Sequence, residues 1–122
     1  MDARPGTKIV SVRIANLLAI IAASLVMVPV CASADPSAAR QRELVNLVRQ
    51  DCGSCHGMTF RGGIGPPLTP DALRETPAES LTLTILNGRP GTPMPPWRPF
   101  VTESEAVWIV ERLQRGNLDA AH

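Results

Sequence analysis

The sequence predicts a small all-α domain with long irregular loops. Apolar residues recur at three- and four-residue spacings in three stretches, which is the pattern of helices that pack on a core. Serine or threonine stands before each stretch, as helix caps do. The 9 glycines and 12 prolines gather mainly between these stretches, where they mark turns and loops. A chain of 122 residues is short enough for one domain.

Residues 1–34 have the pattern of a cleaved secretory signal peptide. The positive charges of this segment are Arg4, Lys8 and Arg13. An uncharged apolar run follows over 16–30, and Ala32-Ser33-Ala34 supplies the small residues that a signal peptidase requires. If uncut, the stretch would be long enough to span a bilayer, so a retained membrane anchor is the alternative. Cys31 lacks the small preceding residue of a lipoprotein signal, and we expect it to be removed with the segment.

The predicted mature domain, residues 35–122, is poor in two kinds of residue. Lys8 is the only lysine of the chain and lies outside this domain, so a strongly basic nucleic-acid-binding surface is not expected. The aromatic residues are only Phe60, Trp97, Phe100 and Trp108. Because a domain of this size buries a limited core, we expect a large apolar group to complete it.

The first helix is expected to begin after Ser37, a favourable N-cap residue. Its apolar face runs through Leu44, Val48, Cys52 and Cys55. These spacings place both cysteines on the buried side, near the end of the helix. Gly57 disfavours continuation beyond that point.

Two further helix starts are expected at Thr69-Pro70 and Thr76-Pro77, because proline suits the first helical position after a cap. Glu79 stands three residues after Thr76 and would complete a capping box. The apolar residues of this second main helix are Leu81, Leu83, Ile85 and Leu86. Asn87-Gly88 is expected to end it. Two threonines leave a strand as the alternative here, which the caps on both sides disfavour.

The prolines of 89–99 exclude a helix or an interior strand and predict a stiff loop with Met94 at its middle. The last helix is expected to begin at Thr102, where Glu105 completes a capping box. Its apolar stripe consists of Ala106, Ile109, Val110 and Leu113. Gly116 is expected to close it.

Cys52-Gly53-Ser54-Cys55-His56 is the attachment signature of a c-type haem. The two thiols can form thioethers with the two vinyl groups of one porphyrin, and His56 is then held under the iron as its proximal ligand. A structural zinc site requires four ligands, and a thioredoxin-like pair belongs at the start of a helix that follows a strand. Neither context is present, although a plain disulfide between Cys52 and Cys55 stays as the alternative. We expect one covalently attached haem c.

Met94 is expected to be the second axial ligand, because its thioether is a soft donor and histidine–methionine ligation raises the reduction potential. Met58 follows His56 too closely to reach the opposite face of the ring. His122 could compete, but it stands at the chain end, where a ligand is poorly fixed. The alternative for Met94 is gap-filling in the core, which its proline-rich surroundings disfavour.

Four more residues are expected around the haem, namely Pro66, Leu68, Arg89 and Trp97. The Pro66 carbonyl is the candidate acceptor for the Nδ1 hydrogen of His56, which would orient the ring. Leu68 is expected to pack on the haem, and a simple rigid turn is the alternative for this segment. The other two flank Met94 and are candidate donors to the haem propionates, as is Arg98. Ordinary solvated side chains are the alternative for these donors.

Residues 37–116 resemble class I cytochromes c in the order of their parts. These parts are the haem motif that closes the first helix, the Gly65-Pro66-Pro67-Leu68 loop, the middle helix, the methionine loop and the final helix. The resemblance implies the class I cytochrome c fold, in which the N- and C-terminal helices cross. It also implies axial ligation by His56 and Met94.

Three segments make the resemblance narrower. Residues 51–59, 62–70 and 85–97 are similar to the cytochrome c55X family, small periplasmic cytochromes encoded with cytochrome cd1 nitrite reductase in denitrifying bacteria. The likeness implies a periplasmic protein, matured by the haem-attachment machinery, that carries electrons to that reductase. The alternative is an accessory role in maturing haem d1 for the same reductase. An enzyme or gas sensor, in which Met94 leaves the iron, is the least favoured hypothesis.

Overall fold

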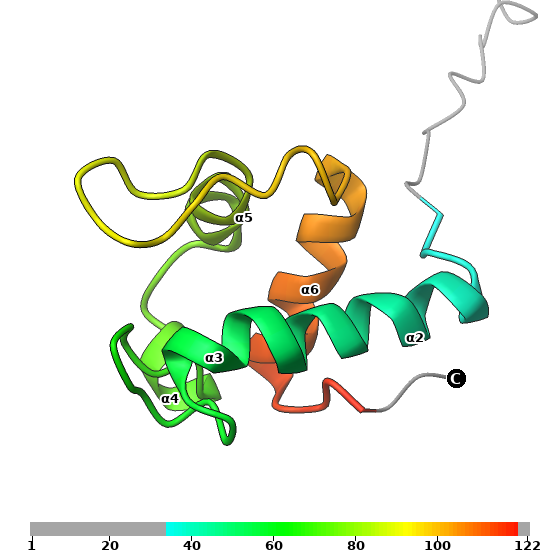
Figure 1. The fold of residues 1–122 in the computed structure, drawn as a ribbon. Helices are drawn as coiled ribbons and strands as arrows, with labels where there is room; N and C mark the ends of the chain where they lie inside the picture. Colours follow the sequence, from blue (N-terminus) through cyan, green and yellow to red (C-terminus); the bar gives the residue numbers. More distant parts are fainter. Residues whose placement is uncertain (1–33, 120–122) are drawn as a thin grey trace, which may run out of the picture. The chain divides into compact units, whose positions relative to one another are not determined.

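Residues 34–119 are described by a computed structural model (Figure 1). Between these residues all regular secondary structure is helical and no strand occurs. No helix of this part is long and apolar enough to cross a membrane. The predicted signal segment up to residue 33, with Cys31, and the terminal His122 lie outside the described residues, so the statements about them stay predictions.

The first helix carries the cysteine–histidine motif at its end. α2 spans Ala38–Leu47, continues through a wider π-helical turn, η1, over Val48–Cys52, and ends in α3 over Gly53–His56. The side chain of Ser37 accepts a hydrogen bond from a backbone N–H of the first turn at 3.3 Å, so the predicted cap is confirmed. Gly57 ends the helix at a φ of 87°, a conformation that favours glycine.

The middle of the chain forms two helices, α4 over Pro70–Leu73 and α5 over Ala78–Asn87. The predicted capping box at Thr76 is wrong, because Pro77 occupies the N-cap position of α5 and no side chain caps the helix. Thr76 belongs instead to the turn that closes α4, where its N–H donates to the carbonyl of Leu73 at 3.1 Å. The threonines of α5 bond carbonyls four residues earlier, so this segment is a helix and not a strand.

The last helix, α6, spans Glu103–Arg115 and has both predicted ends. The hydroxyl of Thr102 accepts from the N–H of Glu105 at 3.2 Å, and the Glu105 carboxylate accepts from the N–H of Thr102 at 2.8 Å. This is a complete capping box. Gly116 closes the helix in the left-handed conformation, at a φ of 66°.

Helix α6 is the element on which the others pack. Figure 1 shows α2 crossing α6, while α5 and α4 contact other parts of it. The predicted crossing of the N- and C-terminal helices is therefore confirmed. The buried cluster at the centre consists of Leu44, Val48, Leu73, Leu86, Val101, Ala106, Trp108, Ile109, Leu113 and Leu118. The part of the α5–α6 loop around Met94 forms one wall of the cavity described next, while Val101, near the end of this loop, belongs to the buried cluster.

Candidate haem site

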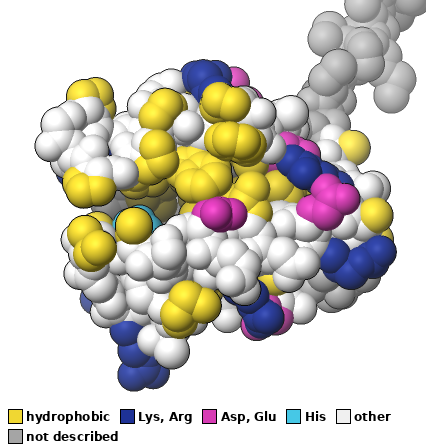
Figure 2. Space-filling model, in the orientation of Figure 1, with side chains coloured by type: hydrophobic (Ala, Val, Ile, Leu, Met, Phe, Trp, Pro, Cys, Tyr) yellow, Lys and Arg dark blue, Asp and Glu magenta, His cyan; other side chains and the backbone are white. Residues whose placement is uncertain are grey.

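A cavity of about 860 Å³ lies between the end of the first helix, the loop before α4, helices α5 and α6, and the loop that contains Met94. Figure 2 shows hydrophobic side chains gathered around a hollow in this face, with a histidine at its edge. Cofactor pockets commonly measure about 300–1,000 Å³ and are mostly apolar. The apolar wall includes Leu68, Leu73, Leu81, Ile85, Ile109 and Leu113. The cavity therefore has the size and polarity that a haem requires.

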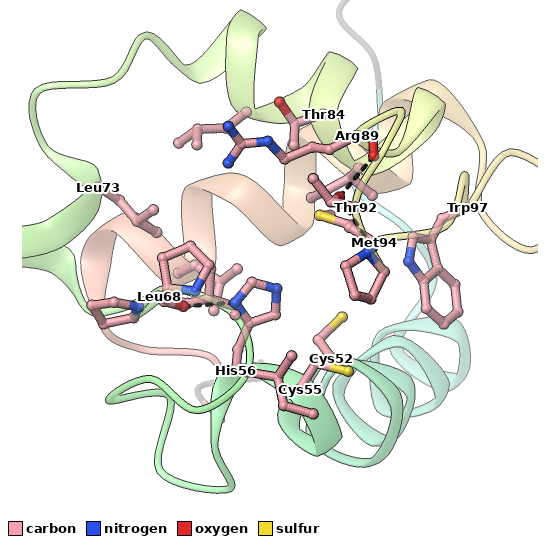
Figure 3. A pocket seen from close by; sticks show the side chains of 18 of the residues that line it. Cys52, Cys55, His56, Leu68, Leu73, Thr84, Arg89, Thr92, Met94 and Trp97 are labelled. Atoms are coloured by element: carbon pink, nitrogen blue, oxygen red, sulfur yellow. Dashed lines mark hydrogen bonds between the residues drawn. The ribbon is translucent and has the colours of Figure 1, made fainter.

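Two thiols and an imidazole face this cavity from the end of the first helix. Figure 3 shows Cys52, Cys55 and His56 on η1 and α3, and all three line the same space. No disulfide joins Cys52 and Cys55, so both sulfur atoms are available for thioether bonds. Burial raises the pKa of the Cys52 thiol to about 11, and the negative charge of Asp51 adds to the rise. This thiol is consequently neutral at physiological pH.

His56 is held by contacts on two sides. Its Nδ1 lies 2.6 Å from the carbonyl oxygen of Pro66, and Nδ1 carries the proton because a carbonyl can only accept. Gly65 packs against the ring, since a Cβ atom there would come within 2.8 Å of it. The residue is only 8% exposed. Its other ring nitrogen, Nε2, has no hydrogen-bond partner within residues 34–119 and is the nitrogen left for a metal ion.

Met94 lines the cavity across from His56 (Figure 3). The N–H of Arg89 donates to the carbonyl of Met94 at 3.1 Å. The Thr92 hydroxyl donates to the carbonyl of Arg89 at 2.7 Å and accepts from the N–H of Met94 at 3.3 Å. Gly88 permits this tight turn, because its φ is 67° and a Cβ atom there would lie 2.7 Å from the Met94 carbonyl oxygen. A rigid turn thus presents the thioether to the cavity.

The remaining residues predicted around the haem divide into two groups. Leu68, Arg89 and Trp97 line the cavity, whereas Arg98 does not. Arg98 donates to the side chain of Asn87 at 2.9 Å, which occupies it at the end of α5. Figure 3 shows the guanidinium of Arg89 extending over the cavity. Within residues 34–119 this guanidinium forms no ion pair or side-chain hydrogen bond, so it is available to an anionic group.

Several residues of the cavity wall could not be assigned to it from the sequence alone. Ile109 and Leu113 belong to the predicted apolar stripe of α6, but the part of that stripe that meets the cavity depends on how the helices cross. Thr84 lines the cavity from α5, where the sequence suggested only an alternative strand. Asp51 is the only carboxylate of the described part that lines the cavity, and its position just before Cys52 is the one hint of this.

Several known proteins are similar to this chain in sequence and fold. Residues 39–111 match the family model described as cytochrome c oxidase, cbb3-type, subunit III. Cytochrome c55X of Pseudomonas aeruginosa is 53% identical over 90 residues, which cover 74% of this chain and 76% of that protein. Cytochrome c55X of Paracoccus denitrificans is 50% identical over 101 residues, 83% of this chain and 92% of that protein. The chain belongs to the cytochrome c55X family.

A solved structure supports the same conclusion. The c-type cytochrome NirC is 54% identical to this c55X-family chain, with a TM-score of 0.67, and the match covers 68% of this chain and 98% of that chain. The predicted all-α cytochrome fold and the c55X resemblance are therefore confirmed. A c-type cytochrome holds its haem covalently, and the cavity fits one such group through its paired thiols and apolar walls. The prediction of haem c is confirmed as well.

A shorter likeness connects this c55X-family cytochrome with a much larger protein. Dihydro-heme d1 dehydrogenase of Pseudomonas aeruginosa is 44% identical over 48 residues. The match covers 39% of this chain but only 10% of that protein. The dehydrogenase therefore contains a segment similar to part of this cytochrome, and most of its length has no counterpart here.

Proposed function

We propose that this cytochrome is a periplasmic electron carrier, in which Cys52 and Cys55 bind one haem c through thioether bonds and His56 and Met94 are its axial ligands. The observation that supports this most is the pairing of donors across the cavity. An imidazole with a free Nε2 and a thioether lie on its two sides, and two thiols stand at the wall. When bound, the haem supplies an iron that takes up and returns one electron.

The residues around these ligands hold the cofactor in one orientation. The Pro66 carbonyl fixes the tilt of the imidazole, and this hydrogen bond makes the ring a stronger donor. Leu68 packs against the haem. Arg89 and Trp97 would donate to its propionates, a role that is supported by their place in the lining and by the Arg89 guanidinium, which has no side-chain partner within residues 34–119.

The site favours a carrier over an enzyme. His56 and Met94 would both bind the iron from opposite sides of the cavity, which would leave no place for a substrate on it. The hydrogen-bonded turn of Arg89, Thr92 and Met94 opposes release of the thioether. Membership of the c55X family supports cytochrome cd1 nitrite reductase as the redox partner in denitrification. A carrier of this kind is expected to make small, transient contacts with its partner.

Visible spectroscopy of the holoprotein tests the ligation. We expect the narrow α-band of a c-type haem after reduction. After oxidation we expect the weak far-red band that is typical of a bond between the haem iron and a methionine sulfur. Met94→Leu should keep the haem, lose the far-red band and bind carbon monoxide when reduced. Met58→Leu is the matched control, because Met58 is 63% exposed and does not line the cavity. A far-red band that survives in Met94→Leu or disappears in Met58→Leu would refute the assignment of Met94.

Rapid mixing with the proposed partner tests the function. Reduced cytochrome should be reoxidised quickly by oxidised cytochrome cd1 nitrite reductase, and nitrite should sustain repeated turnover. The Met94→Leu variant should transfer electrons more slowly, because its potential and its ligation both change. If wild-type cytochrome fails to exchange electrons with the reductase, that partner is excluded and the carrier needs another acceptor.

A second candidate function is accessory to haem d1 maturation, and the likeness to dihydro-heme d1 dehydrogenase favours it. In this role the cytochrome would accept the electrons released when dihydro-haem d1 is oxidised. Each cytochrome takes one electron, so two cytochromes would be reduced and two protons released for each dihydro-haem d1. Mixing oxidised cytochrome with that dehydrogenase and its substrate distinguishes the two functions, because reduction of the cytochrome is expected only for this second role.

A further inference from the structure

One arginine of the first helix joins three separate parts of the domain. Arg40, on α2, donates from Nε to one carboxylate oxygen of Glu105 at 2.6 Å and from Nη2 to the other at 3.2 Å. The same Nη2 donates to the carbonyl oxygen of Phe100 at 2.8 Å. Nη1 donates to Glu43 at 2.8 Å. Only the rigid fork of a guanidinium makes contacts in these directions at the same time.

The contact between Arg40 and Phe100 matters because Phe100 is the last residue of a turn, residues 97–100, that follows the methionine loop. The N–H of Phe100 donates to the carbonyl of Trp97 at 2.9 Å, and the centroids of the two aromatic rings are 5.7 Å apart. Trp97 lines the cavity, and its backbone N–H donates to the carbonyl of Ile85 in α5 at 3.0 Å. Residues 97–100 therefore form the C-terminal anchor of the loop that presents Met94.

The carboxylate that Arg40 binds beside this anchor is shielded from water. The Phe100 side chain is 62% exposed and adds little packing of its own. The Glu105 side chain, by contrast, is only 13% exposed, so its attraction for Arg40 is screened less than that of a surface pair. Their hydrogen bond lowers the pKa of Glu105 and raises that of Arg40. Both groups therefore stay charged at neutral pH.

We infer that Arg40 is a positioning residue for the methionine loop: by binding Glu105 and the Phe100 carbonyl together, it fixes the C-terminal anchor of the loop and keeps the Met94 thioether at the cavity. This inference rests on the ligation by Met94 proposed above. Without Arg40, the loop keeps its backbone bonds at Arg89 and Trp97 but opens more often. An external ligand that replaces Met94 then binds more tightly, in proportion to the open population.

Titration of the oxidised holoprotein with imidazole measures how easily Met94 is displaced. Arg40→Gln is expected to bind imidazole roughly tenfold more tightly than the wild type, which corresponds to about 1.4 kcal/mol, and to have a weaker far-red band. Arg40→Lys keeps the charge but not the fork, so its imidazole affinity should fall between the two. It also provides the test if Arg40→Gln does not fold.

Arg49→Gln is the matched control. Arg49 follows α2 on the same helical segment and pairs with Asp119, beyond the end of α6, but makes no hydrogen bond to the methionine loop. Its imidazole affinity should equal that of the wild type. The inference is overturned if Arg40→Gln and Arg49→Gln bind imidazole equally, whether both weakly or both tightly. A wild-type protein without the far-red band would instead refute the ligation by Met94 itself, and the inference with it.

Discussion

Gly65 and His56 are in direct contact: a Cβ atom added at Gly65 would lie 2.8 Å from both Cε1 and Nδ1 of the imidazole. Non-bonded carbon atoms have their optimal separation at about 3.5–4.0 Å, so only a residue without a side chain fits here. The next residue, Pro66, supplies the carbonyl that lies 2.6 Å from Nδ1. One short segment thus fixes both the position and the tilt of the ring that we propose as the proximal ligand.

Gly65→Ala is therefore expected to destabilise the holoprotein by about 1–3 kcal/mol, the usual effect of overpacking. Gly65 does not have a positive φ, so the added methyl group acts through the contact alone. If the ring moves away from Pro66, the imidazole becomes a weaker donor, and the reduction potential should rise. Urea unfolding followed by circular dichroism and a redox titration measure the two effects.

Gly53→Ala provides the control for this variant. Gly53 is helical, at a φ of −61°, and the nearest atom to an added Cβ would be the sulfur of Met58 at 3.4 Å, which can move. Because alanine favours a helix over glycine by roughly 0.5–1 kcal/mol, Gly53→Ala should be as stable as the wild type or slightly more so. Equal losses of stability in the two variants would show that the contact with His56 is not the cause.

Alanine substitutions at Gly88 and Gly91 distinguish the effect of backbone strain from the effect of a steric contact in the methionine loop. Their φ angles are 67° and 78°, so alanine at either position costs roughly 1–3 kcal/mol in strain. A Cβ at Gly88 would also lie 2.7 Å from the Met94 carbonyl oxygen, whereas none of the surrounding atoms lies within 4 Å of one at Gly91. We expect Gly88→Ala to lose the far-red band and Gly91→Ala to keep it. Identical oxidised spectra for the two would contradict a role of Gly88 in placing Met94.

The parts of the site that the sequence predicts are those encoded by neighbouring residues. Cys52, Cys55 and His56 form one motif on one helical end, so their convergence follows from local geometry. The contribution of Ile109 depends on the rotation of α6 against α2, which no local pattern determines. Leu83 shows the same limit, because it is one of the apolar residues of the predicted middle helix and yet is 43% exposed.

The two predicted capping boxes illustrate the limit for the fold. Thr102 and Thr76 each precede a glutamate by three residues, but only Thr102 caps a helix. Thr76 belongs to the turn that closes α4, through its hydrogen bond to Leu73. The sequence alone does not show that this turn forms in place of a cap on α5. Thr102→Ala should therefore lower the free energy of unfolding by about 1 kcal/mol. Thr76→Ala should change it by less than about 0.5 kcal/mol, and a larger loss in Thr76→Ala than in Thr102→Ala would contradict the caps described here.

The charge of Glu105 gives the stability a pH dependence of definite sign. The hydrogen bond from Arg40 is the main cause that lowers the pKa of this carboxyl in the folded state. A group with a lowered folded pKa stabilises the fold above its unfolded pKa, which is about 4.3 for glutamate. That contribution is lost as the pH falls through the lower folded pKa. Glu105→Gln removes the charge, while glutamine still permits a capping box.

At neutral pH we expect Glu105→Gln to be less stable than the wild type by about 1–2 kcal/mol, because the ion pair with Arg40 is replaced by a hydrogen bond from the guanidinium to an uncharged amide. The difference between the two proteins should begin to shrink as the pH falls below about 4, because the carboxyl is then protonated in the unfolded chain, and it should vanish once the pH has fallen through the lower pKa of the folded state. Urea unfolding of both holoproteins at a series of pH values measures this difference, and the titration of all other groups cancels in the comparison. A difference that stays constant down to about pH 3 would mean that Glu105 acts through its shape and its cap, and not through its charge on Arg40.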